Sequence, residues 1–147
     1  MQDFNRAVVV GEASTFGKGT VQQPMDIGRM LPLFSNRNDA GFLKVTIQKF
    51  YRPSGSSTQM DGVASDIIIP SIMDGLEIGE SYLEHSLPHD LIRSAGDFKL
   101  LDAERLFIPK LKQLSLTRVD ACRDFEYVRD DVRRTTERIT ANTLSLN

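Results

Sequence analysis

Apolar and polar residues alternate most regularly between residues 41 and 51. Leu43, Val45 and Ile47 alternate there with polar side chains. This period of two predicts a strand with one face in the core and the other in water. The strand is predicted to end at Pro53, because proline cannot donate a hydrogen bond to a neighbouring strand.

Shorter apolar runs predict further strands. Residues 7–10 are apolar and stop at Gly11, as expected of a buried strand that ends abruptly. A second short strand is predicted over residues 20–23, and a third over residues 67–69, where Pro70 ends it. Most of the chain between the second strand and residue 41 is expected to be loop.

The last third of the chain has helical periodicity. Pro109 is expected in the first turn of one helix, where proline is tolerated, and Asp124 is expected to cap a second helix. The second helix carries charges of both signs, which is typical of a face in water. The apolar residues at helical spacing are Phe107, Leu111 and Leu114 in the first helix, and Phe125, Val128, Val132 and Ile139 in the second.

These elements predict an α+β (α/β) fold class with short strands in a mixed or antiparallel sheet. The composition changes after Pro70 to a polar stretch that contains glycine. We therefore predict one unit over residues 1–72, which carries the strands, and a mostly helical C-terminal extension over residues 73–147.

Composition excludes several classes of protein. The chain has 147 residues, 40% of them hydrophobic, and a formal net charge of −2. These values indicate a globular protein that can bury a core of ordinary size, and they argue against a nucleic-acid binder or a disordered tail. No apolar run has membrane-spanning length. The single cysteine, Cys122, excludes a disulfide within the chain.

The segment around Lys18 carries the candidate chemistry, and three interpretations of it compete. Lys18 stands between Gly17 and Gly19 after the first predicted strand. The simplest interpretation is a surface lysine in a glycine-rich turn. A phosphate-binding loop fits poorly, because Gly11 and Gly17 are one residue too far apart and Gly19 replaces the Ser or Thr that binds Mg²⁺. The third is a lysine that acts as a base, which requires an amine kept dry and uncharged.

Other residues offer weaker candidates. Ser14 is close to Lys18 in sequence but lies in a predicted turn, where solvated or capping roles are the default. His85 and His89 flank a short segment that contains proline, and no third metal ligand of suitable spacing stands nearby. No metal and no cofactor is therefore expected.

Two ordered blocks of sequence and the C-terminal third resemble one known family. The first blocks run from Arg6 to Gln22 and from Lys44 to Ile67, and the third runs from Ile108 to Val128. Together they resemble the C-terminal processing peptidases, or tail-specific proteases, which are serine endopeptidases with a Ser–Lys dyad. The resemblance covers nearly the whole chain. One departure is Ser65, which stands where the family has a proline.

The resemblance implies roles for particular residues. Lys18 would be the general base, and Gln22 or Asp3 would orient it, with Gln22 ranked slightly higher. Gly17 and Gly19 would let a peptide substrate approach the backbone. Val10, Phe16 and Val21 would surround the lysine and keep its amine out of water.

The resemblance also implies that the site is divided. The nucleophilic serine, the oxyanion-hole amides and the peptide-binding PDZ module would precede residue 1, so this fragment alone is expected to be inactive. Its partners would be those upstream segments and protein or peptide substrates recognised at their C-termini, in the periplasm or cell envelope. The alternative is a non-catalytic scaffold or interaction domain that docks to other domains or self-associates. No nucleic-acid partner is expected.

Overall fold

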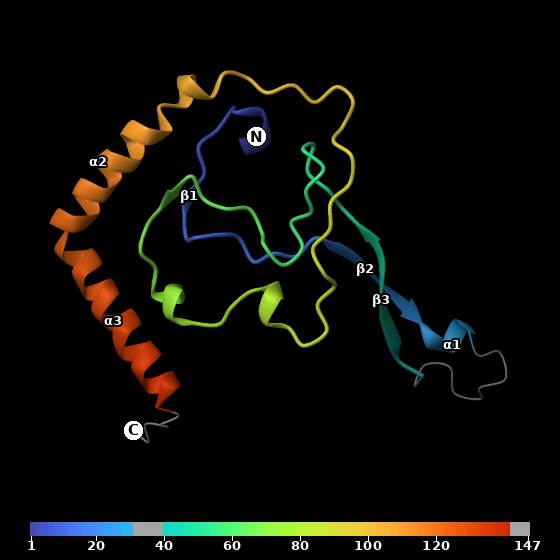
Figure 1. The fold of residues 1–147 in the computed structure, drawn as a ribbon. Coiled ribbons are helices and arrows are strands. Elements are labelled where there is room, and N and C mark those ends of the chain that lie inside the picture. Colours follow the sequence, from blue (N-terminus) through green and yellow to red (C-terminus); the bar gives the residue numbers. More distant parts are fainter. Residues whose placement is uncertain (31–39, 142–147) are drawn as a thin grey trace.

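The structure is a computed structural model that describes residues 1–30 and 40–141 and contains both helices and short strands (Figure 1). This confirms the α+β class. Residues 31–39, which belong to the predicted loop before residue 41, lie outside the described residues. In chain order the elements are η1 (Gln2–Phe4), β1 (Val10–Gly11), β2 (Thr20–Asp26), α1 (Ile27–Met30), β3 (Phe42–Lys49), β4 (Ile67–Ile68), η3 (Ile72–Gly75), η4 (Glu80–Tyr82), η5 (Ala103–Leu106), α2 (Ile108–Ala121) and α3 (Arg123–Thr140).

The described strands form two separate pairs. β1 runs parallel to β4, with Val10 opposite Ile67. β2 runs antiparallel to β3, from Thr20 opposite Lys49 to Asp26 opposite Phe42. The register of this second pair shifts between residues 21 and 22, where the pairing is irregular. The predicted strands therefore exist, but they do not join into one sheet within the described residues.

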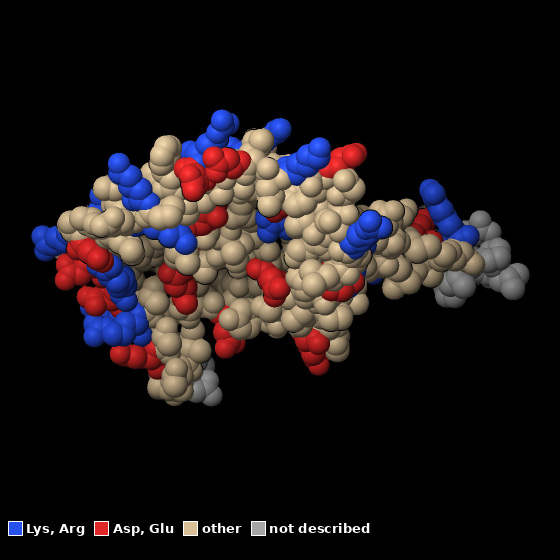
Figure 2. Space-filling view, turned by 45° about the horizontal axis from the view of Figure 1, so that its top comes forward, with Lys and Arg blue, Asp and Glu red and all other residues tan. Residues whose placement is uncertain are grey.

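The β2–β3 hairpin projects from the rest of the molecule as an arm (Figure 1). Leu43 and Ile47, predicted to face the core, are 53% and 49% exposed. That prediction was wrong, because no described segment covers the apolar face of β3. Figure 2 shows that the outer part of the arm carries few charged side chains, whereas both signs of charge are mixed over the opposite, helical end.

The strand predicted over residues 7–10 is much shorter than expected. Only Val10 and Gly11 form β1, and Val10 is 51% exposed. The reason lies in residue 9, whose N–H donates to Asp66 Oδ2 at 2.8 Å and whose carbonyl accepts from the Asp66 N–H at 2.8 Å. The carboxylate of Asp66, just before β4, thus pairs with residue 9 where a longer β4 strand would have done so.

The two C-terminal helices form at the predicted positions. Pro109 lies in the first turn of α2, as predicted. α3 begins at Arg123, so Asp124 lies in its first turn and is not the N-cap. A carboxylate there still stabilises the positive end of the helix. α2 packs on β4 and α3 packs along η3, so both helices lie against one side of the strand-bearing part (Figure 1).

The predicted core of ordinary size is not present in the described residues. Ile67 and Val119 are the apolar side chains that are buried there, at 7% and 6% exposure. The buried polar side chains are Thr20, Ser57, Gln59 and Glu80. The interior beside β2 is therefore held together by hydrogen bonds more than by apolar packing. No described helix has the length and apolar character needed to cross a membrane.

Candidate active site

Lys18 lies in the connection between β1 and β2, residues 12–19, which we call the lysine connection. The backbone of this connection is hydrogen-bonded on both sides of Lys18. Gly17 O accepts from Met60 N at 2.8 Å, and Gly19 O accepts from Phe50 N at 3.0 Å. The carbonyl of Lys18 itself accepts from Thr58 Oγ1 at 3.2 Å. The 57–60 segment thus runs along this connection and determines its path.

The two glycines are required by this close contact. A Cβ on Gly17 would lie 2.5 Å from Met60 O, and φ at Gly17 is +93°, which favours glycine. A Cβ on Gly19 would lie 2.6 Å from Gln59 N. The close approach that these glycines permit is therefore to another segment of the same chain. Their predicted role in binding a peptide substrate stays a prediction.

The side chain of Lys18 reaches Gln22. Its Nζ donates to Gln22 Oε1 at 3.0 Å, so the structure brings together the predicted base and its first-ranked orienting residue. Gln22 is neutral and lies four residues further on, in β2. An amide acceptor can orient an amine without favouring its charged form as a carboxylate would.

Lys18 is exposed in this chain, and the expectation that its neighbours bury it was wrong. Val10, Phe16 and Val21 are themselves 51%, 50% and 40% exposed. Side chains this exposed do not form a dry pocket around the amine. Any segment that keeps the amine dry must come from outside the described residues.

Asp3 belongs to a different cluster. Its carboxylate forms an ion pair with Arg52, which also donates to Gln2 Oε1 at 2.9 Å. Gln2 Nε2 in turn donates to Asp66 Oδ1 at 3.0 Å. Asp3 therefore helps to fix η1 to the turns that flank β3 and β4, and no contact joins it to Lys18 among the described residues.

Two of the remaining candidates, Ser14 and His89, contact residues other than Lys18. Ser14 is exposed, and its Oγ donates to the adjacent Thr15 O at 3.2 Å. His89 Nδ1 lies 3.0 Å from Asp61 Oδ2 and 3.3 Å from Gln59 O. Over residues 1–30 and 40–141, no three His, Cys, Asp or Glu side chains gather as a metal site would require.

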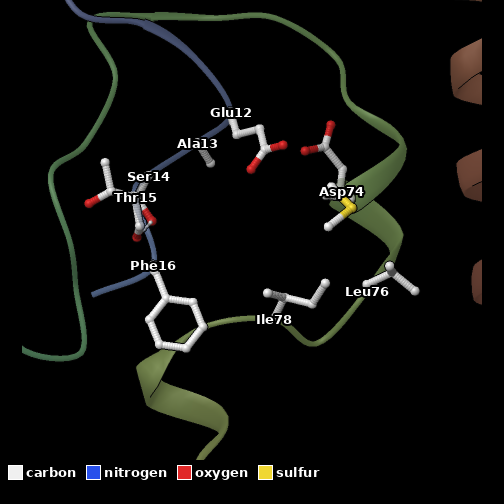
Figure 3. Close-up of a pocket in the computed structure, with 9 residues that line it drawn as sticks. Glu12, Ala13, Ser14, Thr15, Phe16, Asp74, Leu76 and Ile78 are labelled. Carbon is white, nitrogen blue, oxygen red and sulfur yellow. Dashed lines mark hydrogen bonds between the residues drawn. The ribbon is translucent and has the colours of Figure 1, made fainter. Parts of the chain in front are cut away.

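A pocket lies between residues 12–16, which form the first part of the lysine connection, and residues 73–78 (Figure 3). The carboxylates of Glu12 and Asp74 point toward one another across it. Glu12 Oε1 accepts from Ser71 Oγ at 2.8 Å, which joins residue 12 to the N-cap of η3. Lys18 does not line this pocket, so the pocket is distinct from the site around the lysine.

An acidic group near the β3 end has a perturbed pKa. Burial opposes the ionisation of Asp90, but hydrogen bonds from Lys49 and Tyr51 outweigh it and hold the pKa of Asp90 below its usual 3.8. Lys49 Nζ and Tyr51 Oη lie 3.1 Å and 3.0 Å from Asp90 Oδ2. The same environment, burial first and then Asp90, raises the pKa of Tyr51 above 10.0.

This arrangement predicts a pH dependence of stability. Because the pKa of Asp90 is lower in the folded state, its contribution is complete above the unfolded value of 3.8 and is lost as the pH falls through the folded value. Asp90→Asn should therefore lower the unfolding temperature at pH 7 and reduce its dependence on pH below 4. Thermal unfolding across this range measures both. If the unfolding temperature of Asp90→Asn falls with acid pH as that of the wild type does, Asp90 is not the source of this pH dependence.

Comparisons with known protein families match both parts of the chain. The sequence profile of peptidase family S41 matches residues 1–69, and that of the C-terminal domain of tail specific protease (DUF3340) matches residues 73–147. The chain belongs to the tail-specific protease family. The first match ends at residue 69 and the second begins at residue 73, within η3. The division of the chain between residues 72 and 73 stays a prediction.

Two curated relatives support the assignment to the tail-specific proteases. The chain is 37% identical over 152 residues to the tail-specific protease of Haemophilus influenzae. The aligned region covers 100% of this chain and 21% of the relative. The chain is also 37% identical over 89 residues to the carboxy-terminal-processing protease of Bartonella bacilliformis. That aligned region covers 56% of this chain and 18% of the relative. The chain thus spans about a fifth of the length of each of these relatives.

The sequence of this tail-specific protease chain did not single out two buried polar residues close to Lys18. Gln59 is completely buried and Glu80 is 7% exposed, and both lie next to the lysine connection. Gln59 lies within the second block of resemblance, where no role is assigned to it, and Glu80 lies in a polar stretch outside the three blocks. Their importance depends on contacts between segments far apart in the chain.

Proposed function

We propose that this chain is the C-terminal part of a serine endopeptidase that hydrolyses peptide bonds with a Ser–Lys dyad. Lys18 is its general base, and the nucleophilic serine lies N-terminal to residue 1. The observation that supports this most directly is the 3.0 Å hydrogen bond from Lys18 Nζ to Gln22 Oε1. It lies in a connection whose backbone is hydrogen-bonded at Gly17, Lys18 and Gly19, within the part of the chain that the peptidase profile matches.

The proposed reaction is an acyl transfer in two halves. Lys18 Nζ takes the proton of the serine hydroxyl while the serine oxygen attacks the scissile carbonyl. The ammonium then gives this proton to the leaving amine, and an acyl-enzyme remains. In the second half Lys18 takes a proton from water, which attacks the ester, and returns that proton to the serine oxygen as the carboxylic acid leaves.

Gln22 orients the base in this mechanism. Its carbonyl oxygen accepts one N–H of the amine, which leaves the nitrogen lone pair free to face the serine. The amine must also be shielded from water if it is to stay uncharged near neutral pH. Because Lys18 is exposed here, we assign this shielding to the segment that carries the serine. The backbone at Gly17 and Gly19 would lie beside the bound peptide.

The family supports a proposal for the substrates and the location. The names of the two relatives describe tail-specific and carboxy-terminal-processing proteases. We propose that proteins and peptides are recognised at their C-termini by a PDZ module in the N-terminal part of the complete protein. We place the enzyme in the periplasm or cell envelope.

A fluorophosphonate probe tests the dyad, because it labels activated serines covalently. In the complete protein, labelling should occur at one serine N-terminal to residue 1 and should abolish peptide cleavage. The isolated 147-residue chain should remain unlabelled. Labelling of Ser14, mapped by mass spectrometry, would contradict the proposed division of the site.

The exposed apolar side chains of the β2–β3 arm favour a second candidate function, that of a scaffold or interaction domain. Phe42, Leu43 and Ile47 are 73%, 53% and 49% exposed, as expected of a surface that another segment or a second copy covers. A scaffold or interaction domain would need these contacts and no base. Substitution of Leu43 by Ser would then abolish association, whereas Lys18→Ala would leave every function intact.

A further inference from the structure

Gln59 is the most deeply buried polar side chain next to the lysine connection. It is 0% exposed, and both ends of its amide are paired. Gln59 Oε1 accepts from Gly19 N at 2.8 Å, and Gln59 Nε2 donates to Glu80 Oε1 at 3.0 Å. Its backbone N–H donates to the buried Ser57 Oγ at 3.0 Å.

These contacts determine which way the amide points. Gly19 N–H can only donate, so the oxygen of Gln59 must face it. The amide nitrogen then faces Glu80, whose carboxylate accepts hydrogen bonds. Reversing the amide would place a donor against a donor and an acceptor against an acceptor in a buried site, where unsatisfied polar groups are costly.

Glu80 also contacts the lysine connection directly. Its backbone N–H donates to Phe16 O at 2.7 Å. The connection is therefore held at Phe16 by Glu80 and at Gly19 by Gln59, on opposite sides of Lys18. Glu80 belongs to the region matched by the C-terminal domain profile, whereas Gln59 and Lys18 belong to the region matched by the peptidase profile.

We propose that Gln59 and Glu80 are positioning residues for Lys18, and that the C-terminal domain stabilises the catalytic geometry through them. This inference rests on the proposed function of Lys18. Glu80 sets the orientation of the Gln59 amide, the amide fixes the Gly19 N–H, and the backbone on either side of Lys18 is thereby fixed. Both side chains are buried, so they would act on the rate of the chemical step through the lysine and not through contact with the substrate.

Exchanging the two side chains tests the pair in the complete protein. Gln59→Glu places two carboxylates together in a buried site, where they repel unless they share a proton. We expect kcat to fall by about 10- to 100-fold with KM little changed, since small displacements of a catalytic group have effects of this size. Relative to the wild type, the loss should be smaller at lower pH, where one carboxylate is protonated.

The double variant Gln59→Glu with Glu80→Gln should recover most of this loss. The new carboxylate at position 59 would then accept from both Gly19 N–H and the new amide at position 80, so every hydrogen bond is restored. Recovery of kcat, and of slow amide exchange at Gly19, is the expected result. A double variant as impaired as Gln59→Glu overturns the pairing. If Gln59→Glu alone is too unstable to assay, a double variant that is equally unstable overturns it.

Two controls separate this inference from the proposed function. Gln113→Glu makes the same chemical change on an exposed position of α2 and should leave kcat unchanged. If Lys18→Ala is inactive while Gln59→Glu keeps the kcat and the Gly19 exchange rate of the wild type, the positioning role is overturned and the base role stands. If Lys18→Ala is fully active, the base role is overturned, and the positioning role with it.

Discussion

Lys18→Ala in the complete protein is expected to abolish peptide hydrolysis and to leave the fold intact. Loss of a general base removes about 10²- to 10⁴-fold in kcat. The fold should tolerate the change, because the Lys18 side chain is exposed and its described side-chain contact is one hydrogen bond to Gln22. Steady-state cleavage of a peptide substrate measures the loss, and circular dichroism with thermal unfolding checks the fold.

Lys44→Ala is the matched control for this experiment. Lys44 is an exposed lysine on β3, so its loss changes the net charge equally and should leave kcat unchanged. Gln22→Ala should cause a smaller loss than Lys18→Ala, because it removes the orienting acceptor and keeps the amine. Normal turnover by Lys18→Ala would mean that another group acts as the base.

Gly17→Ala is expected to have the largest effect on stability. The added Cβ would lie 2.5 Å from Met60 O, and the residue would have to keep φ at +93°. The backbone conformation costs about 1–2 kcal/mol and the overpacking about 1–3 kcal/mol, which together lower the free energy of unfolding by about 2–5 kcal/mol. Urea unfolding of the complete protein, followed by a probe in this domain, measures the change.

Gly41→Ala separates the two causes of this loss. Gly41 also has a positive φ, +76°, but a Cβ there meets nothing within 4 Å. Its substitution should therefore cost only the conformational part, about 1–2 kcal/mol. If Gly17→Ala and Gly41→Ala destabilise the protein equally, the close contact between residues 17 and 60 does not matter for stability.

The strands and helices were largely predictable from the sequence, whereas their burial was not. Alternation over residues 41–51 predicted β3, and helical spacing predicted α2 and α3. The same alternation placed Leu43 and Ile47 in a core, and the structure leaves both half exposed. A pattern of apolar residues shows which face of a strand is apolar. It does not show whether the segment that covers this face belongs to the same stretch of chain.

The site was predictable only where its residues are close in sequence. Lys18 and Gln22 are four residues apart, and the motif that carries them predicted the contact that the structure shows. Gln59 and Glu80 lie 21 residues apart. Gln59 contacts Gly19, which is 40 residues away in sequence, and Glu80 contacts Phe16. Such contacts depend on the path of the whole chain, which has no local periodicity to reveal it.

The central claim is that the amine of Lys18 accepts the proton of the nucleophile, and chemical replacement of that amine tests it most directly. Lys18→Cys in the complete protein should be inactive. Alkylation with bromoethylamine, which rebuilds a lysine-like amine with sulfur in its chain, should restore cleavage. Because sulfur makes this amine less basic, the acid side of the pH–rate profile should move to lower pH. A folded, fully alkylated protein that stays inactive, or one whose profile equals that of the wild type, would contradict the claim.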